Sequence, residues 1–176
     1  DFINENSNIL KIDESQLKIN RIVINDEIWN VKFTQNFNNV EVYNSKIIFH
    51  IKNDSIVKIK SNFYSDMNID TKATISKKEA KNLALRYLDK KAKVETINLV
   101  IYPIIGQNMN FYKLAYKVDF ETIFDEKPRR YIYFIDAKNG ELINTEDNLV
   151  EAAVQGNING TYIPEYPSQG FSLANH

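Results

Sequence analysis

Cysteine is absent from this chain of 176 residues, and histidine occurs only twice. The lack of cysteine excludes disulfides, thiolate metal sites and a cysteine nucleophile. With His50 and His176 alone, the chain cannot assemble the H-E-x-x-H motif of a zinc protease. Nucleophile-elbow, Walker-type and dinucleotide-binding glycine patterns are missing as well. We therefore expect a protein that is not an enzyme and that binds no metal or cofactor.

The chain also lacks an excess of charge of either sign and any long apolar run. Its formal net charge is -1, which gives no electrostatic reason to expect nucleic acid or an anionic membrane as a partner. No apolar run approaches the roughly 20 residues that span a bilayer. Hydrophobic residues make up 43% of the chain, enough for one good core or two small ones. We expect a folded protein that contacts neither nucleic acid nor a membrane.

Alternating apolar and polar residues predict β-strands over most of the chain. Between Tyr112 and Phe120 every second residue is apolar, which is typical of a strand with one buried face. The same period recurs from residue 131, and Asn139-Gly140 then favours a tight hairpin. Further strands are expected at residues 21–25, 29–34, 46–52, 56–60 and 98–103, with Val57 and Ile59 pointing inward, and with turns at 26–27, 37–40 and 53–55. Consecutive hairpins of this kind predict antiparallel pairing.

One helix is expected between these groups of strands. Ser76 and Glu79 have the spacing of a capping box, in which each side chain satisfies a backbone N–H at the helix start. The apolar residues that follow recur on one face of a helix and are Ala80, Leu83, Ala84, Tyr87 and Leu88. The segment 89–91, Asp-Lys-Lys, ends the helix with cations near the negative end of its dipole.

Two sets of motifs carry a resemblance to known families. The segment Leu114-Ala115-Tyr116-x-Val118, an aromatic strand, and Asp136-Ala137-x-x-Gly140-x-Leu142-Ile143 follow one another as in the closing hairpins of a PepSY domain. This module is best known from the propeptides of secreted thermolysin-like zinc proteases. Earlier in the chain, a second set is similar to the core of the fungalysin/thermolysin propeptide (FTP) domain and consists of Phe33, Gln35, Phe37, Asn39, Val42 and Tyr43. Phe37 stands where that family has Tyr and Asn39 where it prefers Gly, but Asn tolerates positive φ.

These observations predict an α+β fold of two small subdomains, each an antiparallel sheet with a helix packed on it, and an irregular C-terminal tail. The second subdomain would have the cystatin-like form of PepSY. We expect a loosely held N-terminal segment at 1–16, an FTP-like subdomain at 17–70, a PepSY-like subdomain at 71–147, and a tail or junction to a following domain at 148–176.

The resemblance implies a propeptide that keeps a zymogen inactive and assists its folding, so that the parent precursor would be a zinc metalloendopeptidase. The implied partner is the catalytic domain of that protease, and the implied location is secreted or in the cell envelope. Since residue 1 is Asp and not Met, a preceding segment is expected and no secretion signal is visible. The alternative is a stand-alone cell-envelope module of the PepSY kind, or a protease inhibitor acting in trans.

Candidate partner-binding residues are aromatic or lie where the second subdomain passes into the tail. They are Tyr131, Tyr133, Asn148, Leu149, Val150 and Tyr162. The tyrosines of this half have two interpretations: cross-strand pairs within the core, or an interface on an open sheet face.

Three further patterns are interpreted as structural. Asp66, Asn68 and Asp70 have the 1-3-5 spacing of a calcium loop, but Thr71 and Lys77 occupy positions that need Gly and Glu, so a polar linker is the better interpretation. His50 is expected to be a half-exposed strand residue. The basic cluster of Lys127, Arg129 and Arg130 is expected in a solvated hairpin loop, with contact to an acidic partner as the minority view.

Overall fold

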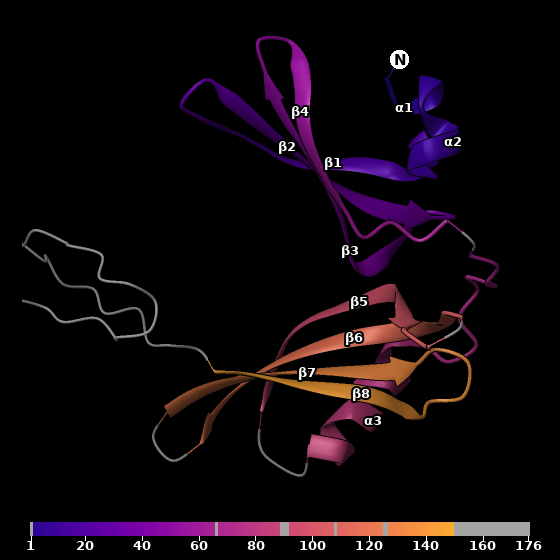
Figure 1. Ribbon diagram of the computed structural model, residues 1–176. Coiled ribbons are helices and arrows are strands. Elements are labelled where there is room, and N and C mark those ends of the chain that lie inside the picture. Colours follow the sequence, from indigo (N-terminus) through magenta and orange to yellow (C-terminus); the bar gives the residue numbers. More distant parts are fainter. Residues whose placement is uncertain (1, 66, 89–91, 108, 125–126, 150–176) are drawn as a thin grey trace, which may run out of the picture.

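The chain folds into one eight-stranded sheet with helices at two places (Figure 1), which confirms the predicted α+β class. The computed structural model describes residues 2–65, 67–88, 92–107, 109–124 and 127–149, without the side chains of residues 7, 122–129 and 148–149. The strand order is β1-β2-β3-β5-β6-β7-β8, and β4 pairs with β3.

The elements fall into two groups along the chain. The N-terminal half contains α1 (Phe2–Glu5), α2 (Ser7–Leu10), the 3-10 turn η1 (Glu14–Gln16), β1 (Leu17–Asn25), β2 (Ile28–Phe37), β3 (Val40–Lys52) and β4 (Ser55–Ser61). The C-terminal half contains α3 (Lys77–Leu88), β5 (Lys93–Ile104), β6 (Phe111–Phe124), β7 (Lys127–Asp136) and β8 (Leu142–Leu149). Strand β3 begins six residues before the predicted strand at 46–52, and β5 begins five before the predicted strand at 98–103.

A short parallel contact joins the two halves, where two separate antiparallel sheets were expected. Glu41 and Val42 of β3 pair in parallel with Val100 and Ile101 of β5, whereas the other strand pairs are antiparallel. Further along β3, residues 47–52 pair with β4 on the same edge. The expectation of antiparallel pairing throughout was therefore wrong at this seam, because hairpin signals in a sequence report only pairs between neighbouring strands.

The predicted tight turns are confirmed by their backbone geometry. Residues in the left-handed region close the first three hairpins: Asp26 and Glu27, Asn38 and Asn39, and Asn53 and Asp54. Asn and Asp tolerate this region better than other side chains. Gly140 has a φ of 80° in the last hairpin, and an added Cβ there would lie 2.7 Å from Leu83 Cδ1. The turn thus lies directly against α3.

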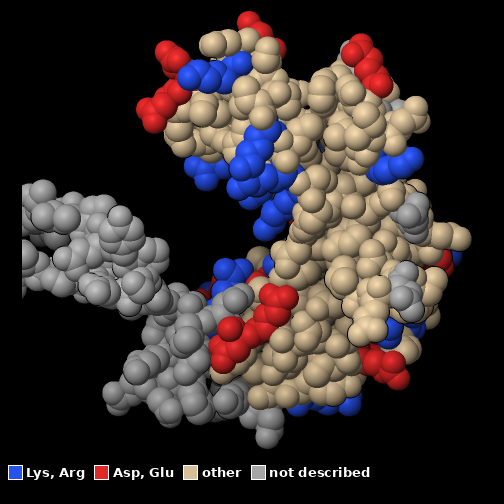
Figure 2. Space-filling model, viewed as in Figure 1, with Lys and Arg blue, Asp and Glu red and all other residues tan. Residues whose placement is uncertain are grey.

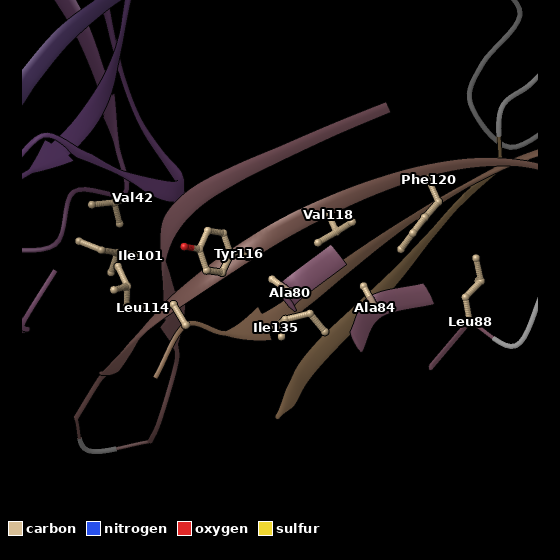
Figure 3. Close-up of a cluster of buried hydrophobic side chains, with 11 residues drawn as sticks. Val42, Ala80, Ala84, Leu88, Ile101, Leu114, Tyr116, Val118, Phe120 and Ile135 are labelled. Atoms are coloured by element: carbon tan, nitrogen blue, oxygen red, sulfur yellow. The ribbon is translucent and has the colours of Figure 1, made fainter. Parts of the chain in front are cut away.

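Helix α3 covers one face of the C-terminal half and forms the main core (Figure 3). The capping box is present, because Ser76 N donates to Glu79 Oε2 at 2.7 Å and Glu79 N donates to Ser76 Oγ at 3.2 Å. From the predicted stripe Ala80, Ala84 and Leu88 are buried and Leu83 is partly buried. Tyr87, in contrast, is exposed. The buried stripe of the helix therefore consists of Ala80, Ala84 and Leu88.

The N-terminal segment is helical and packed, not loosely held. Ile12 is buried with Ile47 and Phe49, and Ile3 and Leu10 pack against this second core. The expectation for Val57 was also wrong. A register shift between His50 and Ile51 accommodates an extra residue in β4, and Val57 is exposed while Ile56 and Ile59 pack inward.

Candidate partner-binding surface

The tyrosines predicted as a partner surface lie on the helix-bearing face of the C-terminal half. Tyr131 and Tyr133 are half-buried and pack against the core beneath α3. The ring of Tyr133 meets Phe120 edge-on, with centroids 5.4 Å apart, and burial raises the pKa of this tyrosine. Tyr112 and Tyr116 pack against the same core. The four tyrosines thus follow the core interpretation.

The remaining predicted site residues lie at or past the end of the described chain. Asn148 and Leu149 are the last residues of β8, and their side chains are not described. Val150 and Tyr162 lie outside the described residues. Whether the six predicted site residues form one surface therefore stays a prediction.

On the opposite face of the C-terminal half no helix of the described residues packs, yet the centre of this face is buried. Val100, Ala115, Ile132 and Phe134 form a small cluster there, covered by Tyr43, Tyr102 and Ile143. The Tyr43 and Tyr102 rings stack with centroids 5.9 Å apart, and both contact Phe134. Since Tyr43 belongs to β3, an aromatic side chain from the N-terminal half shields the sheet of the C-terminal half.

Hydrogen bonds hold these two rings in place. Tyr43 donates its hydroxyl to Glu146 Oε2 at 2.7 Å, which links β3 to β8 across the seam. Burial and this hydrogen bond raise the pKa of Tyr43 above its ordinary value. Asn144 Nδ2 donates to the Tyr102 hydroxyl at 2.8 Å. On this face the rings of Tyr43 and Tyr102 cover the buried cluster. The hydrogen bonds of their hydroxyl groups fix the positions of the two rings.

Gln35 is the polar centre of the N-terminal half and is fully buried. Its Nε2 donates to Gln16 Oε1 and to the Tyr64 carbonyl, each at 2.8 Å. Its Oε1 accepts from Ser45 Oγ at 2.8 Å and from Tyr64 N at 3.1 Å. All four hydrogen-bonding positions of the amide are filled, which is what a buried amide needs to avoid a desolvation penalty. The Gln35 side chain thus connects η1, β3 and the start of the linker, which is the segment between β4 and α3.

A polar groove of about 350 Å³ lies where β3 and β5 diverge from the seam. Its walls carry side chains of β2 and β3 on one side and of β5 and β6 on the other: Thr34, Asn36, Asn39, Glu41, Tyr43, Asn44, Ser45, Lys46, Asn98, Leu99, Val100 and Lys117. Among the described atoms, Asn36 Nδ2 is buried without a hydrogen-bond partner. Amides, hydroxyls and ammonium groups of this kind can bind a polar segment, but they include no activated nucleophile.

A buried carboxylate orders the strands beside this groove. Asp119 accepts from Thr96 Oγ1 at 2.7 Å and from an Arg130 guanidinium nitrogen at 2.8 Å, and Lys117 Nζ lies 3.2 Å away. Burial acts to raise the pKa of Asp119, but these hydrogen bonds and the charge of Lys117 outweigh it and lower the pKa below its ordinary value. Arg130 was expected in a solvated loop. It is instead a partner of this carboxylate, because β7 begins at Lys127.

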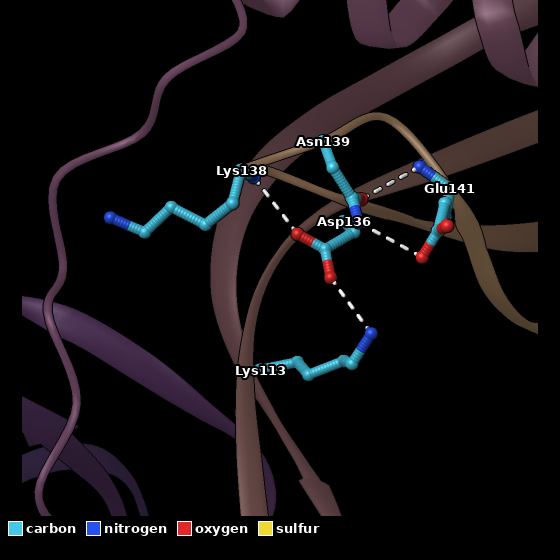
Figure 4. Close-up of polar contacts among 5 residues, drawn as sticks. All are labelled: Lys113, Asp136, Lys138, Asn139 and Glu141. Carbon is cyan, nitrogen blue, oxygen red and sulfur yellow. Dashed lines mark hydrogen bonds and ion pairs between the residues drawn. The ribbon is translucent and has the colours of Figure 1, made fainter.

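The final hairpin is built around Asp136 (Figure 4). Its carboxylate accepts from Lys113 Nζ at 2.9 Å and from the Lys138 backbone N–H at 2.9 Å. Burial acts to raise the pKa of Asp136, but the hydrogen bonds outweigh it and lower the pKa below its ordinary value. The Ala137 carbonyl accepts the backbone N–H groups of Thr74 and Ile75. The Asp-Ala-x-x-Gly motif therefore closes the turn and fastens the linker to it.

Of the near-calcium motif, Asp66 lies outside the described residues, and Asp70 belongs to the same attachment. Asp70 accepts from Lys138 Nζ at 2.6 Å, so this carboxylate is engaged in tying the linker to the last hairpin. Among the residues that the structure describes, no group of three or more His, Asp or Glu side chains is placed to hold a metal ion. No helix within the described ranges has the length and apolar character to cross a membrane.

Comparisons with known proteins identify the C-terminal half. Residues 74–146 match the PepSY family, described as "Peptidase propeptide and YPEB domain". The chain thus contains a PepSY domain, a type of module that is generally a non-catalytic propeptide or binding unit. No curated protein matches the chain.

Solved structures are also similar to the chain, among them the following two. One is the Bacillus megaterium YpeB C-terminal domain, with 21% identity, a TM-score of 0.44, and coverage of 82% of this chain and 62% of that one. The chain therefore spans less than two thirds of that structure. The other is described as a "putative lipoprotein" from Clostridium difficile 630, with 16% identity, a TM-score of 0.34, and coverage of 82% and 91%.

Proposed function

We propose that this chain is the pro-region of a secreted zinc metalloprotease, in which it keeps the catalytic domain inactive and assists its folding. The observation that carries the proposal is the PepSY domain at residues 74–146, whose family description names peptidase propeptides. The FTP-like residues of the N-terminal half support it. We retain the division into an FTP-like part at 17–70 and a PepSY-like part at 71–147 as part of this proposal.

The positions of the FTP-like residues suggest why the two parts would act together. Gln35 anchors the linker, while Val42 is fully buried in the core beneath α3 and Tyr43 caps the opposite face. The same short motif therefore contributes to both halves of the molecule. A propeptide built this way would present one preformed surface to its protease, which lowers the ordering cost of binding.

We propose that inhibition uses the end of β8 and the segment that follows it. Asn148 and Leu149 at the end of β8, then Val150 and Tyr162, would lead from the sheet toward the active-site cleft and block substrate there. The exposed portions of Tyr131 and Tyr133 would add contact area. While the propeptide and the enzyme are one chain, the effective concentration of the inhibitor is high, and cleavage between them removes this advantage. The released propeptide would then be degraded and inhibition would end.

The alternative is a stand-alone envelope module that restrains a protease in trans. It is favoured by the second half of the family description, which names YpeB alongside peptidase propeptides. Sequencing the gene beyond the codon for His176 separates the two. A reading frame that continues into an H-E-x-x-H segment supports the propeptide, and a stop codon supports the alternative.

The role itself is tested by inhibition kinetics. The full chain and a chain that lacks residues 150–176 are each added to a secreted zinc metalloprotease of the same organism. We expect the full chain to inhibit reversibly and then to be consumed as a slow substrate, and the shortened chain to inhibit less. Circular dichroism confirms that both chains are folded. Equal inhibition by both chains would exclude the cleft-blocking role of the tail.

A further inference from the structure

The N-terminal sheet has one strongly basic face. Val31, Phe33, Ile47 and Phe49 point into the core with α1 and α2, so the alternate residues of the same strands point to the opposite face. The cations on that opposite face come from all four strands and are Lys18, Arg21, Lys32, Lys46, Lys52, Lys58 and Lys60. Because Lys52 has Glu27 nearby, we give the name basic face to the other six. Five are exposed and Lys32 is half-buried.

The strand register places these cations in rows across the sheet. Arg21 lies directly opposite Lys32, which in turn is opposite Ile48, and Ile48 is opposite Lys60. A neighbouring row runs from Lys18 through Thr34 to Lys46. Like charges directly opposite one another destabilise a sheet. The Arg21–Lys32 pair is therefore a cost to folding that the core beneath it must offset.

Acidic residues of the same half do not neutralise the basic face. Among the described residues of this half, Glu41 is the one acidic residue within the strands, and Asp26, Glu27 and Asp54 lie in the hairpin turns. Glu5, Asp13 and Glu14 belong to the N-terminal segment, which packs on the other face of the sheet. Glu27 is near Lys52, at 3.9 Å, which is not one of the six. Within the described part of the chain, none of the six cations has a salt-bridge partner within 4.0 Å.

The basic face borders the hollow between the two halves. Lys46 and Thr34 line the groove at the seam together with Asn98 and Lys117 of the C-terminal half. Figure 2 shows Lys and Arg side chains gathered on the underside of the N-terminal half, along the hollow that separates it from the C-terminal half. A second depression of about 250 Å³ lies between Lys46 and Lys60, with Ile48 in its lining. The apolar side chain of Ile48 thus has a lysine side chain on each side, Lys46 and Lys60.

The shape and chemistry of the hollow select the class of partner. A flat bilayer cannot enter the groove that Lys46 lines. A folded protein with an acidic protrusion can meet the cations with carboxylates and the remaining wall with neutral polar groups, as electrostatic complementarity requires.

We propose that the basic face is a docking site for an acidic surface of a partner protein. Carboxylates of the partner would replace the missing acidic neighbours of the six cations and relieve the repulsion between Arg21 and Lys32. This inference rests on the charge and register of the N-terminal sheet and on the groove beside it, so it stands whether or not the partner is a protease.

The test uses the full chain and poly-L-glutamate as the acidic polypeptide probe. The basic-face variant carries Lys46→Glu, Lys58→Glu and Lys60→Glu, and the control variant carries Lys77→Glu, Lys78→Glu and Lys81→Glu on the exposed side of α3, so that both have the same net charge. We expect the control to bind like the unchanged chain and the basic-face variant to bind roughly tenfold more weakly or worse. Binding should also weaken as salt is raised from low to physiological concentration.

Three results would overturn the proposal: no binding of poly-L-glutamate at low salt, equal weakening by both variants, or binding to phosphatidylglycerol vesicles in preference to poly-L-glutamate. The far-ultraviolet circular dichroism of each variant is compared with that of the unchanged chain. If the glutamate variant is unfolded, the set Lys46→Gln, Lys58→Gln and Lys60→Gln is measured instead, and it must also bind more weakly than the corresponding glutamine control on α3.

Discussion

Replacing Gln35 by alanine should be among the most damaging polar substitutions in the chain. The amide is fully buried and makes four hydrogen bonds, two to the Tyr64 backbone and one each to Gln16 and Ser45. Truncation removes all four and leaves the Tyr64 N–H and C=O without their partner. Ser45 Oγ keeps a contact to the Asn62 carbonyl, at 3.1 Å, so its loss is smaller.

The size of the effect follows from these contacts. A net hydrogen bond contributes about 1 kcal/mol, and each buried group left without a partner costs about 1–3 kcal/mol. Partial relaxation and entry of water reduce the sum, so we expect the free energy of unfolding to fall by about 3 kcal/mol. With a urea m-value of about 2 kcal/mol/M, the unfolding midpoint should fall by roughly 1.5 M.

The assay is urea unfolding of the full chain, followed by tryptophan fluorescence and circular dichroism. Gln107→Ala is the matched control, because Gln107 is an exposed glutamine in the loop between β5 and β6 and should change stability by less than about 0.5 kcal/mol. A Gln35→Ala loss of less than about 1 kcal/mol would show that the linker does not depend on this amide, and the account of how the linker is anchored would be wrong.

Three further perturbations test other parts of the fold. Tyr43→Phe removes the hydroxyl bound to Glu146 and should cost about 1 kcal/mol of unfolding free energy, measured by urea titration; an unchanged midpoint would mean that this bond does not hold the halves together. Gly140→Ala should cost about 1–2 kcal/mol because φ is 80°, whereas Gly140→Asn should cost less; equal costs would point to crowding and not to backbone strain. Asp119 and Asp136 have lowered pKa values in the folded chain, so their stabilisation is complete above the ordinary carboxyl range and is lost as pH falls through the folded pKa. The unfolding free energy should therefore drop between about pH 5 and pH 2, and Asp119→Asn should flatten this dependence; a flat profile in the unchanged chain would refute the assignment.

Local features of the fold could be predicted from the sequence because their causes are local. The capping box at Ser76 and Glu79 depends on two side chains three residues apart, and it is present. Asn38 and Asn39 adopt positive φ as their side chains allow. Alternation correctly identified the strands around Phe120, since it reports directly which side chains face the core.

Long-range features could not be predicted in the same way. Hydrogen bonds connect Gln35 to residues 10, 19 and 29 positions away in sequence, and no periodicity marks those partners. The parallel pairing of Glu41 with Val100 likewise leaves no hairpin signal. Val57 was misplaced because a register shift in β4 breaks the period of two. The basic face was missed because cations alternating with apolar residues are also the pattern of an ordinary solvated strand.

The most direct test of the proposed function is the inhibition constant of the intact chain against a secreted zinc metalloprotease of the same organism. Residual protease activity is measured at increasing chain concentration and again after prolonged incubation. The account predicts reversible inhibition at or below micromolar chain concentration, followed by recovery of activity as the chain is cleaved. A folded, intact chain that leaves the protease fully active at micromolar excess would contradict it.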